Sequence, residues 1–80
     1  MKFYGYTEEG LEEDEPKALH LSEITVVANA LELRKLASFF AEQAAAISKD
    51  IEGYEHEHLA DNYPSFRDDP QLIIYSESAL

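Results

Sequence analysis

Cysteine and tryptophan are absent from this chain of 80 residues, and glycine and proline occur only three times each. The lack of cysteine excludes a disulfide framework, a thiolate zinc site and a cysteine nucleophile. The few glycines form neither a G-x-G-x-x-G nor a Walker motif, and no serine lies in a G-x-S-x-G elbow. The sequence therefore predicts a protein that is not an enzyme.

Long apolar runs are also absent. No run approaches the roughly 20 residues of a membrane span, and the first residues do not have the apolar stretch of a signal peptide. The composition is 45% hydrophobic, which is enough for one small core. We expect a single cytoplasmic domain over residues 1–80, without a cofactor and without membrane contact.

Basic residues are scarce, at six Lys and Arg against 17 Asp and Glu, and the net charge is −11. A small domain ordinarily carries a net charge of about 2–8 in magnitude. Direct binding to nucleic acid is not expected, because it needs clusters of Lys and Arg. The charge favours a basic protein partner, although acidity that serves only solubility would give the same composition.

Most of the acidic residues lie in two blocks. Residues 8–15 contain six acids, and Gly10 and Pro16 interrupt regular structure there, so we expect an exposed acidic loop at about 8–17. The second block runs from Asp50 to Asp61 and contains no Lys or Arg.

The hydrophobic pattern predicts an α+β fold. Aromatic residues favour a short strand at 2–7, and apolar residues favour a strand at 18–27. In the latter, the alternation shifts from odd to even positions, which predicts a β-bulge near Ser22-Glu23. Further strands are expected at 54–60 and 72–75, the latter buried.

One amphipathic helix is expected over about 30–51. Asn29 is a suitable N-cap with Glu32 at the capping-box position, apolar residues follow at spacings of three and four, and Gly53 is a plausible stop. Together these elements predict a three- to four-stranded, mainly antiparallel sheet with the helix packed on one face. The other face would be open to solvent or would form a homodimer surface.

His56 and His58 form an H-x-H pair. On a strand both rings point the same way, as a metal ion would need, and His20 or Asp61 could supply a third ligand. Two imidazoles without an evident third ligand predict no tight metal site. Two surface histidines in an acidic strand or loop, free or in contact with a partner, explain the pattern better than a metal site.

The aromatic residues divide into two groups. Phe39, Phe40 and Tyr75 are expected in the core. Tyr54, Tyr63 and Phe66 lie in or beside the second acidic block, where aromatic side chains next to carboxylates are typical of protein-binding surfaces. They could equally cap the edge of a small core.

The run from Tyr54 to Asp61, Y-E-H-E-H-L-A-D, resembles the E-H-E-H-L-x-D signature of the thirty-second immunity family of bacterial polymorphic-toxin systems. The opening M-K-F-Y-G-Y, the runs L-S-E-I-T-V and E-L-R-K-L-A, and the closing P-Q-L-I-I are also similar, so the resemblance covers most of the chain. It implies an inhibitor that neutralises a toxin. Many such toxins are basic nucleases.

The sequence thus predicts an acidic binding protein, with a cognate toxin as its basic partner. The expected partner-binding residues are Glu55, His56, Glu57, His58, Asp61, Tyr54 and Tyr63, with Glu12, Glu13, Asp14 and Glu15 as an arm that steers the partner. The alternatives are a small metal-binding domain that uses His56 and His58, or an inhibitor that mimics nucleic acid.

Overall fold

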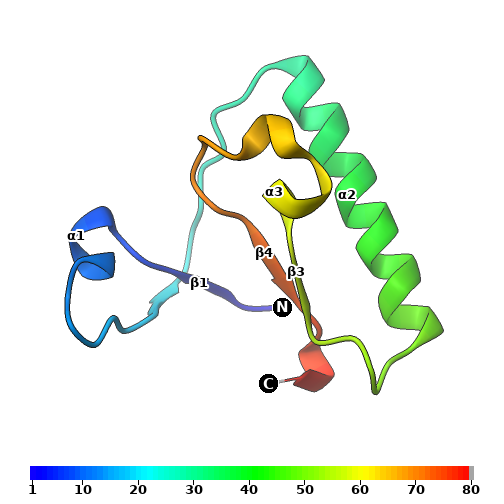
Figure 1. Ribbon diagram of the computed structural model, residues 1–80, viewed down its shortest axis with the longest axis horizontal. Coiled ribbons are helices and arrows are strands. Elements are labelled where there is room, and N and C mark those ends of the chain that lie inside the picture. The colour runs from blue at the N-terminus through cyan, green and yellow to red at the C-terminus, as the bar shows by residue number, and fades with distance from the viewer. Residues whose placement is uncertain (80) are drawn as a thin grey trace.

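A computed structural model describes residues 1–79 and shows an α+β chain with one long helix and small antiparallel sheets (Figure 1). Its four strands form two separate pairs, β1 with β2 and β3 with β4, and not the single sheet that the pattern predicted. The elements in order are β1 (Phe3–Gly5), α1 (Glu8–Leu11), β2 (Leu19–Leu21), α2 (Ala30–Lys49), β3 (His56–His58), α3 (Leu59–Asn62), the 3₁₀ turn η1 (Pro64–Phe66), β4 (Ile73–Tyr75) and the 3₁₀ turn η2 (Glu77–Ala79).

Residues 3–21 form a lobe of their own, here called the hairpin lobe. Strands β1 and β2 pair with Phe3 opposite Leu21 and Tyr4 opposite His20. Helix α1 lies at the far end of this lobe, to the left in Figure 1.

Residues 8–11, expected to belong to the acidic loop, are helical. The side chain of Thr7 caps α1 by accepting a hydrogen bond of 2.9 Å from the backbone N–H of Gly10. Glu8 and Glu9 lie in the first turn, where the partial positive charge of a helix N-terminus favours carboxylates. Only residues 12–18 remain as an irregular, exposed loop.

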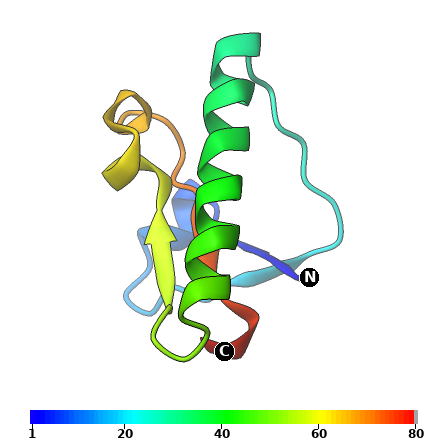
Figure 2. The same ribbon diagram turned by 90° about the vertical axis from the view of Figure 1, so that its right-hand side faces the viewer.

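The second strand is shorter than predicted. β2 ends at Leu21, and residues 22–29 adopt no strand, so the expected bulge at Ser22-Glu23 is wrong. The shift in the alternation marks the point where the chain leaves the sheet. From there the segment 22–29 passes in a wide arc to the start of α2 (Figure 2).

The ends of helix α2 confirm the capping prediction. The backbone N–H of Glu32 donates to Asn29 Oδ1 at 2.8 Å, and the backbone N–H of Asn29 donates to Glu32 Oε1 at 3.0 Å. The helix ends at Lys49, two residues before the expected end. Beyond it, Asp50 Oδ1 accepts a hydrogen bond of 2.9 Å from the N–H of Gly53, and a Cβ at position 53 would collide with that carboxylate.

The core lies between α2, α3, η1 and the β3–β4 pair. Among the described residues its buried apolar side chains are Phe39, Leu59 and Phe66, with Leu36, Tyr63, Leu72 and Ile74 packed around them. Helix α2 and strand β3 lie side by side in both views (Figures 1 and 2). No residue of the hairpin lobe belongs to this core.

The expected assignment of aromatic residues to the core is partly wrong. Phe39 is fully buried, but Phe40 and Tyr75 are 47% and 46% exposed. Phe66 is buried and forms part of the core, as the alternative interpretation allowed. The β4 strand is half-buried because a helix covers only one of its faces.

The described residues contain no helix of sufficient length and apolar character to cross a membrane.

Candidate protein-binding surface

The register of β3 and β4 divides their side chains between two faces. Glu57 lies opposite Ile74, and Ile74 packs against the core. Since side chains alternate along a strand, the neighbouring positions point to the opposite, open face. That face carries His56 opposite Tyr75 and His58 opposite Ile73, and we call these four residues the histidine face.

His56 is held between two rings and a carboxylate. Its imidazole stacks on the Tyr75 ring, with centroids 4.7 Å apart and planes at 21°, and its centroid is 5.4 Å from that of His58. Its Nδ1 lies 3.3 Å from Glu55 Oε1 but has no hydrogen-bond partner of good geometry. The predicted alignment of the two imidazoles on one side of the strand is therefore confirmed.

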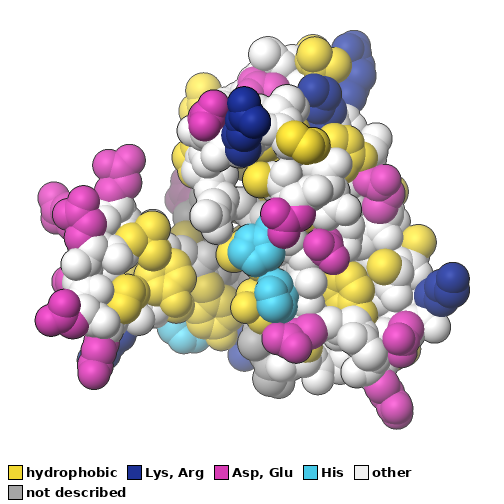
Figure 3. All heavy atoms as spheres, viewed as in Figure 1, with side chains coloured by type: hydrophobic (Ala, Val, Ile, Leu, Met, Phe, Trp, Pro, Cys, Tyr) yellow, Lys and Arg dark blue, Asp and Glu magenta, His cyan; other side chains and the backbone are white. Residues whose placement is uncertain are grey.

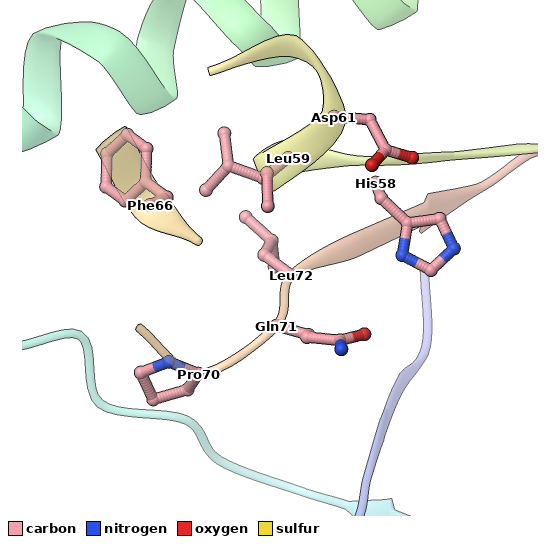
Figure 4. Close-up of a pocket in the computed structure, with 8 residues that line it drawn as sticks. His58, Leu59, Asp61, Phe66, Pro70, Gln71 and Leu72 are labelled. Atoms are coloured by element: carbon pink, nitrogen blue, oxygen red, sulfur yellow. The ribbon is translucent and has the colours of Figure 1, made fainter. Parts of the chain in front are cut away.

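His58 and Asp61 lie at one end of a small cavity (Figure 4). The cavity has a volume of about 90 Å³ and lies between the start of α3 and the chain that leads into β4. Drug-sized ligands occupy pockets of about 300–1,000 Å³, so this cavity suits at most a single side chain of a partner.

No third ligand joins the two histidines. Among residues 1–79, no group of three or more His, Cys, Asp or Glu side chains is arranged to hold a metal ion. His56 also stacks on Tyr75 through one face of its imidazole, a contact that leaves the in-plane lone pairs of the ring nitrogens unoccupied.

Glu57 lies opposite Ile74, on the side of β3 away from the histidine face, and Tyr54, which precedes β3, turns toward α2. The Tyr54 hydroxyl donates a hydrogen bond of 2.8 Å to Oε1 of Gln43, a buried residue of α2. Burial, and secondly the charge of Glu57, raise the pKa of Tyr54. Tyr54 thus ties the chain before β3 to the helix, and the structure does not place Tyr54 or Glu57 with the other candidate partner-binding residues.

Tyr63 also contacts α2. Its hydroxyl donates a hydrogen bond of 2.5 Å to Glu42 Oε1, and its ring packs edge-on against Phe39 at a centroid distance of 6.2 Å. The hydrogen bond to Glu42, then burial, raise the pKa of Tyr63. Tyr63 thus borders the core and is only partly available to a partner.

The four acids of the predicted arm, Glu12, Glu13, Asp14 and Glu15, are all exposed at the end of the hairpin lobe. In Figure 3 the acidic side chains of this lobe lie to the left, and a pair of histidines with further acidic side chains lies on the other lobe. The two acidic blocks therefore occupy separate lobes. A partner that contacts both must reach across the space between them.

Tyr75 and Ile73 are surface residues that the sequence reasoning assigned to a buried strand. Both are exposed on the histidine face, at 46% and 37%. The signal that could have identified them is the presence of only one amphipathic helix, which can cover only one face of the β4 strand.

Comparison of the chain with family models, curated proteins and solved structures gave no match. The resemblance of the segment 54–61 to the immunity family stays a prediction.

Proposed function

We propose that this chain is a cytoplasmic binding protein, without catalytic activity, that neutralises a basic toxin by occupying it. The observation that carries the proposal is the open histidine face, where His56, His58 and Tyr75 form an aromatic surface bordered by Glu55 and Asp61. Aromatic anchors surrounded by polar groups are typical of the centre and rim of protein interfaces.

The charge supports the same partner. A net charge of −11 attracts a basic protein from a distance, and complementary charge can raise association rates to about 10⁸–10⁹ M⁻¹s⁻¹. The exposed acids of the loop 12–15 are free to act in this way without any rearrangement of the fold. Three residues of the E-H-E-H run, Glu55, His56 and His58, lie on or beside the histidine face, where the proposed contact takes place.

Growth protection tests the proposal. A toxin domain encoded beside the gene for this chain is expressed in bacteria with and without the chain. We expect growth only when the chain is present, and no protection from a variant in which His56, His58 and Tyr75 are alanine. Matched alanine substitutions at Leu11 and Tyr6, exposed residues of the hairpin lobe, serve as the control and should protect fully.

Failure of the wild-type chain to protect would contradict the proposal. Protection that disappears when zinc is chelated would instead favour the metal-binding alternative. Protection against several unrelated nucleases would favour an inhibitor that mimics nucleic acid, because such a mimic acts through charge and not through a specific surface.

A further inference from the structure

This chain exposes more surface than its mass requires. Its accessible surface is 6854 Å², whereas a compact monomer of this mass exposes about 4,900 Å², roughly 2,000 Å² less. Its radius of gyration is 13.6 Å, compared with about 11.6 Å for a compact domain of this length. The excess arises because the hairpin lobe and the segment 22–29 stand away from the core (Figures 1 and 2).

Much of the excess surface is apolar. In the segment 22–29, the side chains of Ile24, Val26 and Val27 are 46%, 58% and 93% exposed. Exposed β-branched apolar residues in succession are unusual on a monomer, because the removal of apolar side chains from water is favourable.

Helix α2 carries a second apolar stripe beside the one that contacts the core. Leu33, Ala37, Phe40 and Ala44 follow at spacings of four, three and four, which places them along one side of the helix. All four are exposed, with Leu33 at 50% and Phe40 at 47%. The segment 22–29 therefore does not cover this stripe, although it arcs past the same helix (Figure 2).

These two elements together form what we call the apolar face: Ile24, Val26, Val27, Leu33 and Phe40. None of these residues is charged. Thr25, Ala28, Ala37 and Ala44, which lie between or beside them in the sequence, are uncharged as well. A basic partner gains no electrostatic advantage here. A second copy of this chain, which also carries −11, can approach closely only through a face without acids.

We propose that two copies of this chain form a symmetric dimer through the apolar face, with the Ala37 positions of the two α2 helices close to the two-fold axis. Such an interface is self-complementary, since the same patch serves both subunits. A second copy on the apolar face would bury part of this excess surface, and the rest belongs to the hairpin lobe; interfaces of obligate homodimers bury roughly 2,000–5,000 Å². Small residues at 37 and 44 allow the two helices to approach closely.

Sedimentation equilibrium tests the dimer. The wild-type chain should have twice its mass of 9.1 kDa at micromolar concentration. Its dimer dissociation constant should fall as salt is added, because salt screens the repulsion between acidic subunits. Phe40→Asp should raise that constant at least tenfold. Ala45→Asp, an equally helical site about 140° around α2, should leave it unchanged.

A cross-link tests the geometry separately, in case Phe40→Asp disturbs folding. The chain has no cysteine, so Ala37→Cys introduces a single thiol, which should form a disulfide-linked dimer on mild oxidation. Ala45→Cys should remain uncrosslinked. The dimer would be overturned by a wild-type chain that stays monomeric. It would also be overturned by equal dissociation constants for the two Asp variants, or by equal cross-linking at positions 37 and 45. The proposal does not depend on the toxin, whose binding should weaken with salt.

Discussion

The ring of His56 on β3 stacks on the ring of Tyr75 on β4, with centroids 4.7 Å apart and planes at 21°. The two residues are direct cross-strand partners, so the stack follows from the register of the sheet. It holds the imidazole in a fixed orientation on a surface that remains open. A partner that docks here meets a preorganised ring pair and orders few additional side chains, which lowers the entropy cost of binding.

Tyr75→Ala should therefore weaken toxin binding, mainly by speeding dissociation. We expect a loss of more than about 1 kcal/mol, as is typical of an aromatic anchor. Tyr75→Phe keeps the stacked ring and should bind within about 0.5 kcal/mol of wild type. Surface plasmon resonance against the toxin measures both variants. Equal dissociation rates for the Ala and Phe variants would show that the ring is not an anchor.

The acids of the loop 12–15 should act on the association rate. They are exposed at the end of the hairpin lobe, and exposed charges at a rim influence encounter more than the bound state. Replacing Glu12, Glu13 and Glu15 with Gln and Asp14 with Asn should slow association and flatten its salt dependence. Dissociation should change little in the same kinetic experiment. A variant that dissociates faster than Tyr75→Ala would show that these acids are part of the central contact.

Phe39→Ala should destabilise the fold severely. Phe39 is fully buried in the core, with 0% of its surface accessible to solvent. Truncation of a buried Phe costs about 3–5 kcal/mol. Leu11→Ala, at a site that is 59% exposed in α1, should change the free energy of unfolding by less than about 0.5 kcal/mol. Urea unfolding at one protein concentration compares them. Similar losses for the two variants would mean that the hairpin lobe also packs into the core.

The hydrogen bond from Tyr63 to Glu42 should make stability depend on alkaline pH. The pKa of Tyr63 is raised above its ordinary value of 10.0 in the folded state. The stabilisation of the fold by this hydrogen bond is therefore fully present below pH 10.0. The contribution is lost as the pH rises through the folded pKa. The free energy of unfolding of Tyr63→Phe should therefore be lower than that of wild type below pH 10.0. Above that pH the two free energies should approach each other.

Urea unfolding on either side of that pH measures the difference, with Tyr6→Phe as an exposed control. A constant difference between wild type and Tyr63→Phe at all pH values would indicate that the bond to Glu42 does not form in solution.

Local features of this fold could be predicted because local chemistry determines them. Asn29 and Glu32 form a reciprocal cap that needs only three residues of spacing, and the alternation at His56 and His58 places both rings on one face. The shift in the alternation after Leu21 marks the end of β2, but the sequence alone could not distinguish this end from a bulge. Apolar residues continue to Val27, and only the tertiary arrangement shows that they leave the sheet.

The exposed aromatic residues were misassigned for a related reason. An apolar side chain on a strand or helix predicts burial only when a second layer covers it. Tyr75 lies on the face that α2 does not cover, and Phe40 lies on the stripe of α2 that turns away from the core. For the candidate site, the sequence predicted His56 and His58 but could not show that Tyr54 turns toward the helix or that Glu57 lies on the other side of the strand.

The most direct test of the central claim is the binding of the purified chain to the toxin encoded beside its gene, measured by surface plasmon resonance at low and at physiological salt. We predict a stoichiometric complex whose association slows as salt is added, and whose dissociation speeds up at least tenfold when His56, His58 and Tyr75 are replaced by alanine. No complex at either salt concentration, or a complex unaffected by these three substitutions, would contradict the proposal that the histidine face neutralises a basic toxin.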